Sequence, residues 1–186
     1  MTRHDPETYL ASLREEFPRL RVVAKAEDPL SRGIDAVLRL LTFGGQRAYL
    51  TRYVTTLGQT LYVPSDWDAR PALERYCVLR HEAVHLRQFR RYGLVGMSLL
   101  YLLPILPLGL AWGRARLEWE AYAETFRAHA EVHGIDAARD PRLREHVRSQ
   151  FTGPAYGWMW PFSAQVDGWI DMLLDALEAP RAPEIV

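Results

Sequence analysis

An uncharged segment between two polar stretches places the strongest limit on how this chain can fold. Residues 94–112, LVGMSLLYLLPILPLGLAW, contain no Asp, Glu, Lys or Arg over 19 positions. A run of this length is long enough for a helix that crosses a membrane. Pro104 and Pro107 interrupt its middle and divide it into two short arms. Basic residues flank it on both sides, so the charge pattern favours neither orientation across a bilayer.

The composition of the whole chain is that of a globular protein. It has 186 residues, 48% of them hydrophobic, which is enough for one domain with its own core. The 23 basic and 23 acidic residues balance, so charge does not indicate a nucleic-acid partner. A single cysteine, Cys77, excludes an internal disulfide, and the N-terminus lacks the apolar stretch of a signal peptide. We therefore expect a single cytoplasmic domain.

Hydrophobic periodicity predicts an α+β fold that is mainly helical. The predicted helices cover residues 6–17, 31–43, 68–92 (beginning at Asp68 or Pro71), 114–133, 141–150 and 163–177. Residues 48–63 are rich in Tyr, Val, Thr and Leu, break at Leu57-Gly58-Gln59, and predict a β-hairpin. We therefore expect a short hairpin or small sheet ahead of a long helix. The aromatic segment FTGPAYGWMWPF, residues 151–162, predicts an ordered loop.

The stretch CVLRHEAVHLRQ, residues 77–88, lies near the end of that long predicted helix. His81 and His85 are four residues apart, so they share a helix face and their imidazoles can converge on one metal ion. Glu82 projects beside them, within reach of a metal-bound water, which is the geometry of a general base. Because the pattern also arises by chance, and a catalytic zinc site needs a third protein ligand, a third ligand has to be found.

The best candidates for that ligand are carboxylates in RLEWEAYAETF, residues 116–126. Glu120 and Glu124 are one helical turn apart, with two alanines between them that let another helix approach closely. Glu120 would complete a His-His-Glu set, and Glu124 would hold a ligating histidine through its distal ring nitrogen. Glu118 points away from Glu120, so only one of the two can face the metal.

Other potential ligands fit less well. Cys77 lies one turn before His81, but three ligands along one helix would span about 12 Å of its axis. We interpret Cys77 as a buried packing residue. His129 and His133 also form a pair four apart, but no glutamate follows the first, and we interpret them as a solvated helix face.

With these residues identified, the chain resembles the gluzincin metallopeptidases, in which His-Glu-x-x-His on one helix is joined by a glutamate from a later helix. It is also similar to the small single-domain minigluzincins, where a short sheet precedes the active-site helix and its edge strand aligns the substrate. The resemblance covers residues 48–126. It implies a zinc-dependent peptidase in which Zn²⁺ is held by His81, His85 and Glu120, and Glu82 is the general base.

Two features depart from that family. Glu124 stands where the family often has an aspartate, and the apolar insert, residues 94–112, separates the two ligand helices. If the zinc site forms, the insert must turn back on itself, because one crossing would place Glu120 on the far side of a bilayer. We favour a hairpin in the protein core over two alternatives: a re-entrant or interfacial membrane hairpin, and an apolar surface for a partner or hydrophobic substrate.

Peptide hydrolysis also needs a donor to the oxyanion. Tyr156 in the aromatic loop is the first candidate, followed by Tyr122 and His146. The substrate would be a peptide or protein. One alternative is a non-catalytic protein in which zinc fastens two helices or supports a binding module; Glu82 argues against it, because a structural site needs no general base. The other is a membrane-associated protein with a fortuitous motif.

Overall fold

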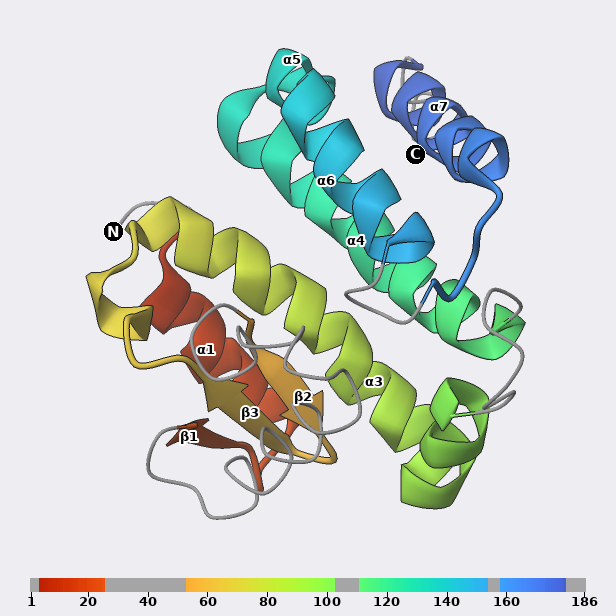
Figure 1. Ribbon diagram of the computed structural model, residues 1–186. Coiled ribbons are helices and arrows are strands. Elements are labelled where there is room, and N and C mark those ends of the chain that lie inside the picture. The colour runs from red at the N-terminus through yellow and green to blue at the C-terminus, as the bar shows by residue number, and fades with distance from the viewer. Residues whose placement is uncertain (1–3, 26–52, 103–110, 154–157, 180–186) are drawn as a thin grey trace, which may run out of the picture. The chain divides into compact units, whose positions relative to one another are not determined.

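The computed structural model describes residues 4–25, 53–102, 111–153 and 158–179 (Figure 1). It is mainly helical, with a small sheet ahead of the long helix that carries the motif, which confirms the predicted fold class. The chain divides into two compact units, residues 1–100 and 101–186. Each unit has a hydrophobic core of its own. The single domain expected from the chain length stays a prediction.

The first unit combines one short helix, a three-stranded sheet and most of a long helix. Its elements are α1 (Pro6–Glu16), β1 (Arg21–Ala24), β2 (Thr55–Leu57), β3 (Thr60–Val63), the 3-10 helix η1 (Trp67–Ala69) and α3 (Ala72–Leu102). The start of α1 is capped by Asp5, whose carboxylate accepts a hydrogen bond from the Thr8 amide at 2.8 Å. This helix begins where its sequence pattern predicts and ends one residue earlier.

The sheet has the strand order β1-β3-β2. The strands β2 and β3 are antiparallel and turn at Gly58-Gln59, as predicted; Gly58 has φ +61°, which glycine adopts without a steric cost. The strand β1 runs parallel to β3, with Arg21 opposite Thr60. The sequence did not predict β1, because its pairing partner is distant along the chain. The predicted helix 31–43 and the first residues of the predicted hairpin lie outside the described residues.

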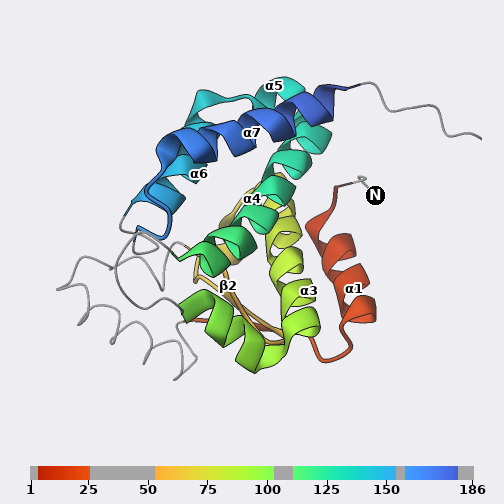
Figure 2. The ribbon, with the colours of Figure 1, turned by 90° about the vertical axis from the view of Figure 1, so that its right-hand side faces the viewer.

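A shared core joins α1, the sheet and α3. Figure 2 shows α1 alongside α3, and both contribute buried side chains to the cluster formed by Leu13, Phe17, Leu20, Leu61, Val63, Trp67, Leu79, Ala83 and Leu86. Burial of one such leucine or phenylalanine stabilises the fold by about 1.5–3 kcal/mol. This cluster fixes which face of α3 points inward, and so it also fixes the directions of the neighbouring motif residues.

The helix α3 is broken at one residue. Gly93 has φ +67° and ψ 175°, so the helix consists of a first segment, residues 72–92, and a second segment, residues 94–102. The first segment ends where the sequence predicted. The second belongs to the apolar insert, of which residues 103–110 are not described. None of the helices in the described ranges is long and apolar enough to cross a membrane.

The second unit is a group of helices that follow one another closely. They are α4 (Trp112–His133), α5 (Ile135–Ala138), α6 (Pro141–Thr152) and α7 (Ser163–Glu178). Their core contains Phe126, Val147, Phe151, Ile170 and Leu174. The predicted helices 114–133, 141–150 and 163–177 are confirmed to within two residues. The single turn α5 was not predicted, because four residues are too few to show a hydrophobic period.

Candidate metal centre

The two motif histidines lie side by side on the first segment of α3. Their ring centroids are 5.1 Å apart and their planes are inclined by 72°. Leu79, Ala83 and Leu86 on the same helix are buried in the core of the first unit, three and four residues apart. This packing orients the helix, and it sets His81 and His85 one turn apart on the face next to the buried one.

Glu82, between the two histidines, is buried and hydrogen-bonded to the sheet. Thr56 Oγ1 donates to Glu82 Oε2 at 2.6 Å. Thr56 belongs to β2, so the hairpin that precedes the helix holds this carboxylate in one orientation. Thr56 was not predicted from the sequence, where its only signal is the position of the hairpin directly before the motif helix.

A second polar contact orients His85. Its Nδ1 is 2.9 Å from Oε1 of Gln88, one turn further along α3, and both side chains are buried. When Nδ1–H donates to this amide oxygen, the lone pair available to a metal is on Nε2. In this tautomer Gln88 orients the ring and leaves Nε2 as the nitrogen that can bind a metal. Its position at the end of the quoted stretch was visible in the sequence, but its role was not recognised.

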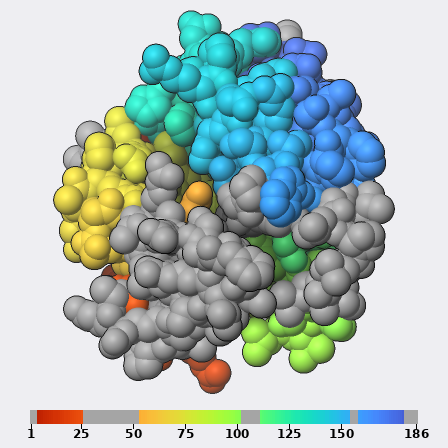
Figure 3. Space-filling view, viewed as in Figure 1, coloured from red at the N-terminus to blue at the C-terminus, as the bar shows by residue number. Residues whose placement is uncertain are grey.

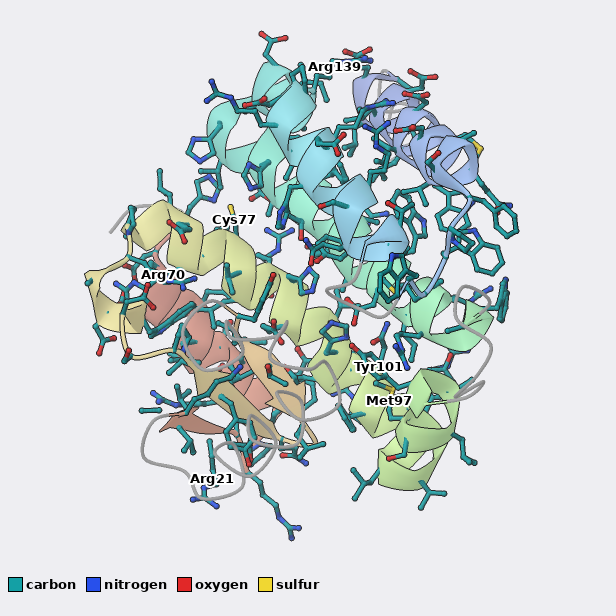
Figure 4. All side chains as sticks on the ribbon, viewed as in Figure 1. Arg21, Arg70, Cys77, Met97, Tyr101 and Arg139 are labelled. Atoms are coloured by element: carbon teal, nitrogen blue, oxygen red, sulfur yellow. The ribbon has the colours of Figure 1, made fainter. Side chains whose placement is uncertain are left out.

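The second unit has a buried carboxylate on α4. Glu118 is only 2% exposed, and Tyr101 Oη donates to its Oε1 at 2.8 Å. Arg114 in turn donates through Nε to the Tyr101 carbonyl oxygen at 2.7 Å, and its guanidinium lies 5.0 Å from the centroid of the Tyr101 ring. Tyr101 is labelled in Figure 4. Its role was also not predicted.

The phenol of Tyr101 stays protonated at neutral pH, so it remains a hydrogen-bond donor. Burial raises the pKa of the Tyr101 phenol well above its usual value, and the negative charge of Glu118 adds to this effect. The neutral phenol can therefore always donate to the Glu118 carboxylate, which restricts how that side chain can rotate.

One group in the described part of the chain could hold a metal ion, namely His81, His85 and Glu118. Each offers one ligand atom, and these atoms lie within 4.8 Å of one another. Two imidazole nitrogens and one carboxylate oxygen form a donor set that zinc uses at catalytic sites.

Glu120, the third ligand expected from the sequence, is not a member of this group. Its side chain is 37% exposed and lies 3.5 Å from the guanidinium of Arg116. Glu118 and Glu120 are two positions apart on α4 and project in directions about 200° apart, so the burial of one directs the other outward. Glu118 is therefore the carboxylate that this group offers, and Glu120 as the third ligand stays a prediction.

Glu124, expected to support a ligating histidine, forms an ion pair with Arg127 at 3.4 Å. It is one turn from Glu120 but six residues from Glu118, so it does not share a face with the candidate ligand. The residue one turn after Glu118 is Tyr122, which is buried. The supporting role of Glu124 stays a prediction, and it loses the argument from spacing that suggested it.

The other residues considered from the sequence are the candidate oxyanion donors and the less favoured metal ligands. Tyr156, the first choice as oxyanion donor, lies outside the described residues. The ring centroids of Tyr122 and His146 are 6.5 Å apart. Cys77 is buried, as predicted. His129 is half-buried, and this burial together with the charge of His133 lowers its pKa.

Comparisons with known proteins leave the family undecided. No protein-family model matches this chain, and neither does any curated protein or any solved structure. The likeness to gluzincins therefore rests on the motif residues alone.

Proposed function

We propose that this protein is a zinc-dependent peptidase in which His81, His85 and Glu118 hold the metal and Glu82 is the general base. The observation that carries the proposal is a pair of adjacent histidines beside a buried, hydrogen-bonded carboxylate, all on the first segment of α3. A zinc ion that only fastens helices needs no such base. The presence of buried Glu82 within the motif therefore favours catalysis over a purely structural site.

The residues of the chain would divide the chemistry among them. A bound zinc ion would act as a Lewis acid and lower the pKa of a water molecule. Glu82 would accept the proton of that water and pass it to the leaving amine, since general bases of this kind work at hydrogen-bond distance. Thr56 would hold one oxygen of Glu82 and leave the other to face the water.

Two further contacts would orient the ligands. Gln88 would keep His85 in the tautomer that ligates through Nε2, and Tyr101 would hold Glu118 by its Oε1. Both contacts are made by uncharged groups, so they position the ligands without competing for the metal. Tyr156 remains the proposed donor to the oxyanion.

The sheet would align the substrate. In the described part of the chain β2 (Thr55–Leu57) is an edge strand, and Thr56 on this strand contacts the proposed base. An extended peptide that adds to such an edge gains main-chain hydrogen bonds. A peptide on β2 would therefore lie close to Glu82.

The test is a comparison of two glutamates on the same helix. In Glu118→Ala the zinc content of the purified protein, measured by atomic emission, should fall to a small fraction of the wild-type value. Glu120→Ala is the matched control and should retain zinc, because its side chain is partly exposed and pairs with Arg116. Loss of zinc only in Glu120→Ala would restore the ligand chosen from sequence. Wild-type protein without zinc affinity would overturn the proposal.

A further inference from the structure

The second segment of α3 exposes an apolar face. Leu94, Val95 and Leu99 are 59%, 73% and 54% exposed, and Ser98 lies between them on the same side of the helix. Met97, labelled in Figure 4, points the other way and is buried. The light-green atoms of this segment reach the lower edge of the space-filling view in Figure 3. We call Leu94, Val95, Ser98 and Leu99 the exposed face.

Three large apolar side chains in so short a helix are a costly surface to leave in water. An apolar side chain is more stable when it is removed from water. A contiguous exposed group of this kind marks a site that contacts another protein or a membrane. The core hairpin favoured from sequence does not hold for these three residues, because their side chains are in solvent.

A cationic pocket adjoins the exposed face. Arg19, Gly58, Gln59, Phe89, Arg90 and Leu94 line it, and it encloses about 300 Å³. Leu94 belongs to both features, so the apolar face continues into the pocket. Among the described residues that line it, two are arginines and none is acidic. We call it the arginine pocket.

Further arginines extend the positive charge around the pocket. The Arg21 amide donates to the carbonyl of Gln59 at 2.9 Å, so the backbone of Arg21 lies next to a residue that lines the pocket. Arg91, next to the pocket residue Arg90, is exposed. Arg87 and Arg90 share one carboxylate, that of Glu16, at 2.7 and 3.0 Å. One carboxylate cannot balance two guanidinium groups, so the surface keeps a positive excess.

We propose that the exposed face and the arginine pocket together dock on the surface of an anionic phospholipid bilayer. Leucine and valine would enter the boundary between headgroups and acyl chains, to a depth of about 5–10 Å. The arginines would lie at the level of the lipid phosphates and bind them. A second copy of the chain fits less well, because a symmetric contact through this surface would bring the arginines of both copies together.

The docking needs no membrane-spanning helix. The broken backbone at Gly93 lets the second segment leave the direction of the motif helix, so it can lie flat on a surface while the motif helix stays in the protein core. A peptidase of this kind would act on substrates at the membrane surface. This last step rests on the proposed function, whereas the docking itself does not.

Vesicle co-sedimentation of the full chain tests the docking. Wild type should bind vesicles of equal parts phosphatidylcholine and phosphatidylglycerol, bind phosphatidylcholine alone more weakly, and lose affinity as salt is added. The triple variant L94Q/V95Q/L99Q should bind the anionic vesicles at least about tenfold more weakly. Glutamine keeps the helix propensity of these positions. Met172→Gln is the matched control, because Met172 is 65% exposed on α7; it should bind as wild type does.

The charge is tested separately. R19Q/R90Q should weaken binding to the anionic vesicles by about tenfold or more, with little change on phosphatidylcholine. Arg139→Gln controls for loss of a surface arginine that pairs with a glutamate, here Glu178 at 2.6 Å, and should have no effect. A thermal melt of each variant confirms that it folds.

Two outcomes would overturn the proposal. One is equal binding by wild type and the triple variant, which includes the absence of binding by either. The other is concentration-dependent self-association of wild type that the triple variant abolishes, which would make a second copy the occupant of this face. Glu118→Ala should bind vesicles as wild type does, so a failure of the metal site and a failure of the docking surface are distinguishable.

Discussion

The two segments of α3 differ in which side chains they bury: the first buries polar side chains, and the second exposes apolar ones. In the first segment Glu82, His85 and Gln88 are polar and buried, whereas in the second Leu94, Val95 and Leu99 are apolar and exposed. Gly93 separates them. Stability alone would favour the reverse arrangement in both segments. We infer that each inversion serves binding: a metal ion at the first segment and an apolar surface at the second.

The costs of the two inversions are met differently. Buried polar groups are tolerated when they are hydrogen-bonded, and Thr56 and Gln88 supply such bonds to Glu82 and His85. The exposed leucines have no equivalent compensation within the described part of the protein. The buried polar groups of the first segment are therefore stabilised within the chain itself. The exposed apolar side chains of the second segment would be stabilised by contact with a membrane, as proposed above.

The largest expected effect is on catalysis by the first segment. Glu82→Gln removes the proposed base and keeps the shape of the side chain, so peptide hydrolysis should fall by about 10²–10⁴-fold. Zinc content should not change, because Glu82 is not a ligand. Hydrolysis can be followed by mass spectrometry of peptide mixtures. Retained hydrolysis would remove Glu82 from the mechanism, and a zinc-loaded wild type without hydrolysis would indicate the non-catalytic alternative.

A smaller effect is expected when a ligand loses its support. Gln88→Leu removes the acceptor for His85 Nδ1, and zinc affinity should fall by about 10–100-fold. A competition titration with a chromogenic chelator measures it. Ser98→Ala, an exposed polar residue on the second segment, is the control and should leave zinc affinity unchanged. Equal affinity in Gln88→Leu would mean that this contact does not select the tautomer.

The backbone conformation at Gly93, between the two segments, is tested by measuring the free energy of unfolding. Gly93→Ala places a side chain at φ +67°, which should destabilise the protein by about 1–2 kcal/mol, although no atom lies within 4 Å of the added Cβ. Gly168→Ala is the matched control. It lies inside α7 with equally open space, and should stabilise the protein by about 0.4–1 kcal/mol. Urea unfolding measures both, and the same sign for the two would contradict the assigned backbone strain.

The smallest effect concerns the ion pairs between α1 and the first segment. Hydrogen bonds from Arg87 lower the pKa of Glu16, and the nearby charges of Arg87 and Arg90 lower it further. This carboxyl has a lower pKa in the folded than in the unfolded chain. Its stabilisation is therefore complete above the unfolded pKa of about 4.3, and is lost as the pH falls through the folded value.

Glu16→Gln should therefore lower the free energy of unfolding at pH 7 by about 0.5–1 kcal/mol. It should also reduce the fall of this free energy as the pH is lowered toward 3. Glu15→Gln, at the exposed neighbouring position, should do neither. Urea unfolding from pH 3 to pH 7 gives the comparison. If the free energy of unfolding of both variants falls with pH as it does in wild type, another group is responsible for that dependence.

Local patterns were sufficient to predict most of the helices and the hairpin in the described residues. Capping residues, glycine stops and helical periodicity act within a few residues, so the limits of α1, α4 and α6 followed from the sequence to within two residues. The end of the first segment of α3 at residue 92 followed as well, but its continuation as a second helical segment was not predicted. The four-residue strand β1 did not follow from the sequence, because it forms only through pairing with β3.

By itself, the sequence determined that His81 and His85 share a helix face and that Glu118 and Glu120 cannot both reach the same ion. Both conclusions follow from the 100° turn per helical residue. Only the tertiary structure shows that Glu118 is buried and Glu120 partly exposed, since this depends on which side of α4 its unit buries. The supporting contacts of Thr56 and Tyr101, and the exposure of the second segment of α3, were decided in the same way. Packing between residues far apart along the chain sets each of them, and no local pattern records it.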